Sequence, residues 1–182
     1  MNRQLLLRNL EQYQTEYEEE QLFIPRFRSL LKNFPDCYKR SLKTGHMTGS
    51  AWIIDEKASA VLLVHHKKLD RWLQPGGHAD GDENIIEVAT REAGEETGLQ
   101  SISLYRNNIF DIDIHQIPKY NGIQAHFHHD IRFIFQADRN ERIRVSEESN
   151  EVAWIPLEEV NNYAKNNRSI HRMILKTNLI FK

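Results

Sequence analysis

Three glutamates at helical spacing are the residues in this sequence whose types and positions point most directly to chemistry. Glu92, Glu95 and Glu96 stand at i, i+3 and i+4, so on a helix they share one face, where like charges repel. A bound cation relieves that repulsion, and hard divalent ions such as Mg²⁺ take oxygen ligands of this kind, completed by waters and phosphates. Arg91 precedes the cluster and is placed to hold one carboxylate by a fork of hydrogen bonds. The pattern therefore predicts a carboxylate metal site.

The elements that would position these glutamates suit a phosphate ligand. The pattern predicts a helix over residues 84–97, with Asn84 at its N-cap and Gly98 just past its end. Gly76 and Gly77 come shortly before it and allow the backbone to approach a ligand closely. A loop that leads to a helix N-terminus also favours anions. Metal and phosphate binding are thus expected on one segment.

The whole segment, GHADGDENIIEVATREAGEETGL over residues 77–99, resembles the signature of the Nudix hydrolases. Ala93 stands where that signature usually has a larger apolar residue. The resemblance extends to WLQPGGH before the segment and to ESNEVAWIPLEEV after it, and covers residues from about 46 to 165. The fixed positions of the signature are matched by Gly77, Glu83, Arg91, Glu92, Glu95, Glu96, Gly98 and Leu99.

The resemblance implies hydrolysis of a nucleoside diphosphate linked to another moiety, with Mg²⁺ as the cofactor and Mn²⁺ as a possible substitute. The implied substrate is a small molecule such as a nucleotide sugar, ADP-ribose or a CDP-alcohol. Cleansing of oxidised nucleoside triphosphates is an alternative within the same enzyme class. A nucleotide-sensing module without turnover is a third reading, although such modules usually lose signature carboxylates and this chain keeps them.

The resemblance also assigns roles to residues. It implies that the metals are bound by Glu92, Glu95 and Glu96, with the Gly77 carbonyl as a possible further ligand. Arg91 would orient the glutamates, while Glu83 and Gly98 would hold the loop-helix-loop together. The general base is either Glu92 or a glutamate on a later loop, where the candidates are Glu147 and Glu148, with Glu148 slightly preferred.

Two polar stripes outside the signature are candidates for substrate contact. His126, His128 and Asp130 alternate with apolar residues on one predicted strand, and Asp111, Asp113 and His115 alternate on another. If these strands pair, the stripes lie side by side and are expected to contact substrate or an accessory metal, since imidazole suits Mn²⁺ or Zn²⁺ better than Mg²⁺. His78, directly after the glycine pair, is expected to point at the phosphates. Exposure to solvent is the alternative for all of these residues.

Strand and helix patterns interleave along the chain, so the fold class is α/β or α+β. The resemblance implies a Nudix α/β/α sandwich with a mixed central sheet and a loop-helix-loop motif. Residues 3–20 are predicted to form one amphipathic helix, followed by an apolar segment, 22–34, that stops before Pro35. We therefore expect a helical N-terminal extension, 1–44, and a Nudix domain, 45–182.

Composition narrows the function classes further. The 182 residues include 24 Lys or Arg and 26 Asp or Glu, for a net charge of −2, so a basic nucleic-acid surface is not expected. No apolar run is long enough for a membrane span, and the one cysteine, Cys37, excludes an internal disulfide. We expect a cytoplasmic protein whose N-terminal helices cover the core or form a homodimer interface. The near-neutral net charge of the whole chain conceals an acidic patch, because residues 80–96 carry seven acidic residues against one arginine.

Overall fold

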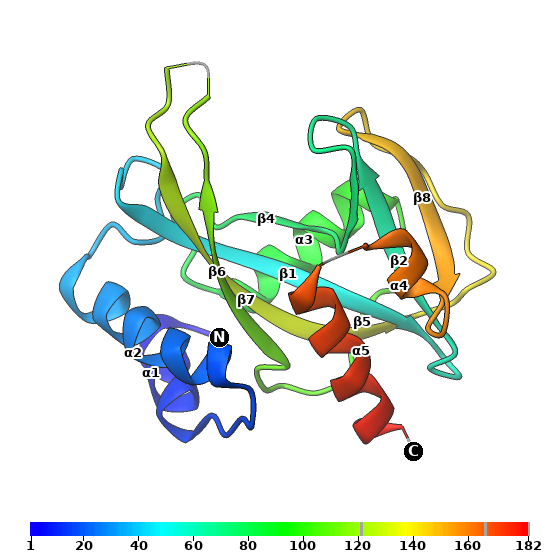
Figure 1. Ribbon diagram of the computed structural model, residues 1–182, viewed down its shortest axis with the longest axis horizontal. Coiled ribbons are helices and arrows are strands. Elements are labelled where there is room, and N and C mark those ends of the chain that lie inside the picture. The colour runs from blue at the N-terminus through cyan, green and yellow to red at the C-terminus, as the bar shows by residue number, and fades with distance from the viewer. Residues whose placement is uncertain (121, 166, 182) are drawn as a thin grey trace. The chain divides into compact units, whose positions relative to one another are not determined.

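The structure is a computed structural model that describes residues 1–120, 122–165 and 167–181 (Figure 1). Helices and strands mix along the chain, which confirms the predicted α+β class. In chain order the elements are α1 (Arg3–Gln12), α2 (Glu18–Asn33), β1 (Gly45–Asp55), β2 (Ala60–His66), β3 (Arg71–Leu73), β4 (Gly76–His78), α3 (Ile85–Thr97), β5 (Ser103–Leu104), β6 (Asp111–Ile117), β7 (His126–Ala137), β8 (Ser149–Pro156), α4 (Val160–Tyr163) and α5 (Arg168–Ile180).

The chain forms two compact units, and β1, β4, α3 and β7 contribute residues to both. The first unit holds α1, α2, β6, the early parts of β1, α3 and β7 and the late part of β4; the second holds β2, β3, β5, β8, α4, α5 and the remaining parts of the shared elements. The predicted boundary at residue 44 does not coincide with this division, and it stays a prediction. The first unit is Met1–Ser50, Gly77–Ala89 and Asn108–Phe133, and the second is Ala51–Gly76, Thr90–Asn107 and Ile134–Lys182.

The predicted single helix over residues 3–20 is wrong, because α1 ends at Gln12 and α2 begins at Glu18. In the connection, the Thr15 hydroxyl accepts a hydrogen bond from the Tyr17 backbone N–H at 3.2 Å, and such local bonds compete with helix formation. The Tyr13 hydroxyl donates to buried Glu20 at 2.8 Å. The same Glu20 oxygen accepts from the Ile112 N–H at 3.1 Å, so the corner between the helices is tied to β6.

The pairing of the two polar strands is confirmed. β6 and β7 form an antiparallel pair in the first unit, drawn as the long hairpin in Figure 1. Residues on the predicted stripes lie directly opposite one another, so the two stripes are adjacent. The opposed pairs are Asp111 with Arg132, Asp113 with Asp130, His115 with His128 and Ile117 with His126.

The second unit is organised around β2. This strand pairs along its length with β8 and, at its two ends, with β1 and β3. Its first five residues are buried, which is typical of a strand in the middle of a sheet. Trp52 on β1 is fully buried, and its indole N–H donates to the Thr177 hydroxyl of α5 at 2.9 Å, so the C-terminal helix is fixed to the strand.

Two glycines set the course of α3. A Cβ on Gly49 would lie 2.9 Å from the carbonyl oxygen of Ile85, so β1 and the first turn of α3 approach as closely as only glycine allows. At the other end, Gly98 has φ +75°, a conformation that favours glycine, and its N–H donates to the Gly94 carbonyl at 2.8 Å. The predicted end of the helix at Gly98 is therefore confirmed.

Candidate active site

The carboxylate cluster lies on the last turns of α3, within the second unit. The Arg91 Nη1 atom is 2.7 Å from Glu92 Oε1 and 3.4 Å from Glu95 Oε2. One guanidinium thus contacts two of the predicted metal ligands, which is the arrangement expected for an orienting arginine. Glu92 is mostly buried, whereas the Glu95 side chain is 61% exposed.

The pKa of Glu96 is strongly raised above the usual value of a glutamate. Burial and, after it, the charges of Glu92, Glu148 and Glu95 together raise the pKa of its carboxyl to about 8, against a hydrogen bond from the Gly76 backbone N–H that lowers it. The loop that carries Glu148 therefore places its charge close to the helix. Several oxygen donors with surplus negative charge fit a hard divalent cation.

The raised pKa of Glu96 predicts a pH-dependent stability for the metal-free protein. A carboxyl with a pKa near 8 in the fold and about 4.3 when unfolded stabilises the fold only while it is protonated. Its contribution is complete below the unfolded value and is lost as pH rises through 8. In EDTA, we expect Glu96→Gln to raise the melting temperature over wild type, and by more at pH 8.5 than at about pH 5.5.

The control for this measurement is Glu56→Gln, which changes an exposed glutamate of the same unit. Its melting temperature is expected to follow wild type at both pH values. A Glu96→Gln variant whose difference from wild type does not change with pH would contradict the assignment. Mg²⁺ is expected to stabilise wild type more at the higher pH, where Glu96 is ionised and available as a ligand.

Two further signature residues belong to the first unit. Glu83 forms an ion pair with Arg3 of α1, 2.9 Å between the charged atoms, so the loop before α3 is tied to the N-terminal helices. This contact agrees with a structural role for Glu83, but the sequence pattern contained no signal for Arg3 as its partner. Gly77 lies in the middle of β4.

Three histidines converge within the first unit. His46 on β1, His78 on β4 and His128 on β7 bring a ring nitrogen each to within 4.8 Å of one another, and the Nε2 atoms of His78 and His128 are 3.2 Å apart. His115 and His126 flank them, with ring centroids 5.4 and 5.3 Å from that of His128. The sequence analysis selected these histidines except His46, which has no motif around it. His46 lies near the other histidines because its strand, β1, is the neighbour of both β4 and β7 in the sheet.

Burial keeps the core of this cluster neutral. It lowers the pKa of His78 to about 4, with a smaller effect of the Arg40 charge. It lowers the pKa of His128 to about 2, with smaller effects of the neighbouring histidines, His78 first. Both rings are therefore unprotonated at neutral pH, with lone pairs available for a hydrogen bond or a ligand.

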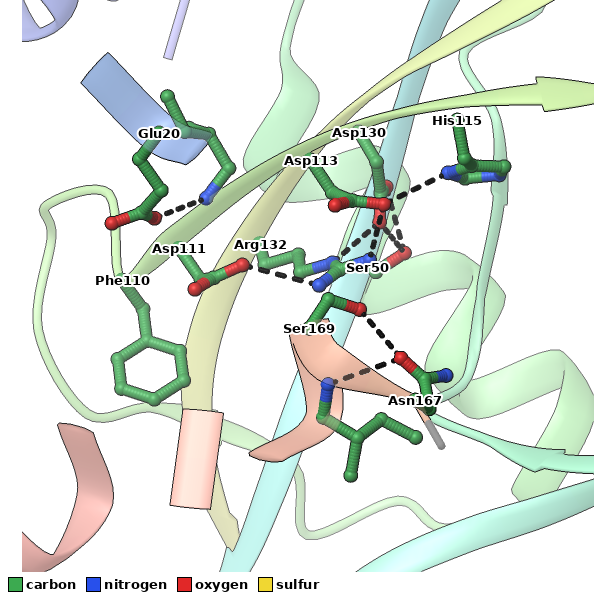
Figure 2. A network of polar contacts seen from close by, with 12 residues as sticks. Glu20, Ser50, Phe110, Asp111, Asp113, His115, Asp130, Arg132, Asn167 and Ser169 are labelled. Carbon is green, nitrogen blue, oxygen red and sulfur yellow. Dashed lines mark hydrogen bonds and ion pairs between the residues drawn. The ribbon is translucent and has the colours of Figure 1, made fainter. Parts of the chain in front are cut away.

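Asp130, predicted to contact substrate, lies instead within a buried ion network. Its oxygens accept hydrogen bonds from Thr48 at 2.9 Å, Ser50 at 2.8 Å and Arg132 at 2.8 Å. Figure 2 shows the Arg132 guanidinium among the carboxylates of Asp130, Asp111 and Asp113; the last two lie 3.1 and 3.2 Å away. The inner half of the polar stripes thus makes internal contacts, and the histidine half forms the cluster described above.

In the part of the chain that the structure describes, no helix is both long and apolar enough to cross a membrane.

Comparison with known families and proteins places this geometry in context. The NUDIX domain model matches residues 46–176. Bis(5'-nucleosyl)-tetraphosphatase [asymmetrical] of Mus musculus is 31% identical over 97 residues, which is 53% of this chain and 59% of the relative. A putative 8-oxo-dGTP diphosphatase of Bacillus subtilis (strain 168) is 33% identical over 79 residues, 43% of this chain and 50% of the relative. The chain thus spans between half and three fifths of these curated relatives.

Solved structures agree with the fold. An Ap4A hydrolase binary complex from C. elegans superposes with a TM-score of 0.60 at 16% identity, covering 74% of this chain and 96% of that one. A NUDIX family hydrolase from Clostridium perfringens superposes with a TM-score of 0.56 at 25% identity, covering 74% of this chain and 97% of that one.

Proposed function

Because this chain belongs to the NUDIX domain family, we propose that it hydrolyses a pyrophosphate bond in a nucleoside di- or polyphosphate derivative. The observation that carries the proposal is the carboxylate cluster of α3, in which Arg91 contacts Glu92 and Glu95 while Glu96 has a pKa of about 8. A cluster of acidic side chains in which burial and neighbouring charges shift a pKa this far is typical of a functional site.

Glu92, Glu95 and Glu96 would hold the divalent ion, with Mg²⁺ expected first and Mn²⁺ as a substitute, because the donors are all carboxylate oxygens. When bound, such an ion neutralises a diphosphate and lowers the pKa of a water molecule. Arg91 limits the movement of two of the ligands through its contacts of 2.7 and 3.4 Å. The acidic side chains would otherwise repel a bare diphosphate, so the substrate arrives with its metal or finds the metal already bound.

For the general base we favour Glu148 over Glu92 and Glu147. Glu92 is already held by Arg91 at 2.7 Å and is one of the proposed metal ligands, so its oxygens are engaged. Glu148 is exposed, and its charge is among the largest that raise the pKa of Glu96, so it lies close to the carboxylate cluster. Its carboxylate would take the proton of the attacking water, which is the step that general-base catalysis accelerates.

A substrate panel tests the proposal. Two relatives are named for activity on a bis-nucleosyl tetraphosphate and on 8-oxo-dGTP, so the panel holds both compounds together with ADP-ribose, a nucleotide sugar and a CDP-alcohol. We expect turnover of at least one compound with Mg²⁺ or Mn²⁺, measured as phosphate release after phosphatase treatment, and none in EDTA. Binding of these nucleotides without turnover of any would contradict the enzyme and favour a nucleotide sensor.

A further inference from the structure

The histidine cluster of the first unit is a site of a different chemical kind from the carboxylates of α3. We propose that His46, His78 and His128 form a second metal site, which binds a divalent transition metal such as Zn²⁺ through three imidazole nitrogens. The proposal does not depend on the hydrolytic function, since neither the residues nor the ligand atoms are shared with the carboxylate cluster.

The spacing of the nitrogens fits a metal. Zn–N bonds of about 2.0–2.1 Å at tetrahedral angles place ligand nitrogens about 3.3–3.4 Å apart. The Nε2 atoms of His78 and His128 are 3.2 Å apart, and a nitrogen of His46 lies within 4.8 Å of both. A movement of the His46 ring by no more than about 1.5 Å toward the other two nitrogens would complete the triangle.

His46 gives the second, independent observation. His46 is 3% exposed, and among the described residues neither of its ring nitrogens has a partner with standard hydrogen-bond geometry. The Leu42 backbone is close enough to raise the pKa of this ring, against the burial that lowers it. Buried polar atoms nearly always have a well-placed partner, so a ring without one calls for a ligand, an ion or a water. The ring lies 5.1 Å from that of His78 and 5.0 Å from that of His128, measured between centroids, and one of its nitrogens lies within 4.8 Å of the ligand nitrogens of both.

Three strands hold the ligands in place. The Ala79 N–H donates to the Met47 carbonyl at 3.3 Å, which fixes β4 beside β1 next to His78 and His46. The Phe127 N–H donates to the Thr44 carbonyl at 3.3 Å, which fixes β7 beside the start of β1. Ligands on strands are positioned more rigidly than ligands on loops, as metal sites require.

The three imidazole ligands indicate which kind of metal the site would bind. Imidazole suits Zn²⁺ and other transition metals, whereas Mg²⁺ prefers carboxylate, carbonyl and water oxygens. Three imidazoles also leave one position of a tetrahedral ion open for water or a ligand oxygen. The nearby Arg40 does not oppose a cation strongly, because its Nε and Nη2 atoms donate to the Asp80 carboxylate, at 2.5 and 2.6 Å, and the negative charge of Asp80 offsets its own. The competing explanation is a plain hydrogen bond between His78 and His128 beside a packed His46.

Metal binding is best measured in a background that removes the other site. In the Glu92→Gln/Glu95→Gln variant of the 182-residue chain, stripped with EDTA and dialysed, we expect one Co²⁺ per chain to bind with the intense visible absorption of a tetrahedral site. Adding His46→Ala or His78→Ala to this background should weaken Co²⁺ binding more than about 100-fold. His171→Ala, which removes an exposed histidine of α5, is the matched control and should bind Co²⁺ like its parent.

Absence of stoichiometric Co²⁺ binding in this background would overturn the proposal, and so would binding that the histidine substitutions leave unchanged. If His46→Ala does not fold, the half-buried His78 still gives the substitution test. Thermal unfolding provides a measurement without any histidine variant, because equimolar Zn²⁺ should raise the melting temperature of the double variant and EDTA should reverse the shift. These readouts separate the two sites, since lack of nucleotide hydrolysis by wild type would contradict the proposed function and leave Co²⁺ binding intact.

Discussion

Glu95→Gln is expected to lower metal-dependent turnover about 100- to 1,000-fold, the size typical of removing one positioned group that stabilises developing charge. The substitution replaces a charged ligand oxygen by a neutral amide of the same shape, and it frees part of the Arg91 contact at 3.4 Å. Because the Glu95 side chain is 61% exposed, the melting temperature should stay close to that of wild type. Steady-state kinetics on the best compound of the panel, at several Mg²⁺ concentrations, would show the loss and a weaker apparent affinity for Mg²⁺.

Glu87→Gln is the matched control, because Glu87 is an exposed glutamate in the first turn of the same helix. It removes the same charge from α3 without touching the cluster, so kcat and the Mg²⁺ dependence should match wild type. Near-normal turnover of Glu95→Gln would contradict the assignment of the α3 glutamates as metal ligands. An equal loss in both variants would point to the overall charge of the helix rather than to ligation.

The carboxylate site was predictable because its information is local. Residues 77–99 fix the helix, its glycine end and the spacing of Glu92, Glu95 and Glu96 within one stretch of chain. The break of the first helix was not predictable from periodicity, because the apolar spacing continues through Tyr13 and Tyr17. At the break, the local hydrogen bond at Thr15 is joined by a long-range contact, because the buried carboxylate of Glu20 accepts from the Ile112 N–H of β6, 92 positions away in the sequence.

The histidine cluster was predictable only in part, because some of its members are far apart in the sequence. Alternation selects His126 and His128 on one strand, but the pairing of β6 with β7, a condition in the sequence analysis, comes from the structure. His46 is separated from His128 by 82 residues, and no pattern in its neighbourhood marks it. Alternation also gave the same prediction for Asp130 as for His128, whereas the Thr48 and Ser50 hydroxyls and Arg132 take up the oxygens of Asp130. Two of these donors, Thr48 and Ser50, lie on β1, which is distant in the sequence. The alternation within β7 alone therefore does not show which of its polar residues makes internal hydrogen bonds.

Arg132→Met is expected to destabilise the fold by about 3–5 kcal/mol, the cost typical of removing one partner from a buried ion pair. Methionine keeps much of the apolar stem but leaves the carboxylates of Asp111, Asp113 and Asp130 without the guanidinium that lies 2.8–3.2 Å from them. The loss is large because the Arg132 side chain is 3% exposed and that of Asp111 is fully buried, so water does not replace the missing charge. Urea unfolding followed by far-UV circular dichroism would measure it.

Two features distinguish this mechanism from simple loss of packing. Arg139→Met removes a 48% exposed arginine that lies 3.9 Å from Asp55, and it should cost less than about 1 kcal/mol, as exposed pairs do. The stability lost in Arg132→Met should also shrink as pH falls toward the ordinary pKa of aspartate, about 3.9, because protonated carboxyls no longer repel one another. A loss that is constant with pH would mean that the packing of the arginine stem, not its charge, stabilises this part of the first unit.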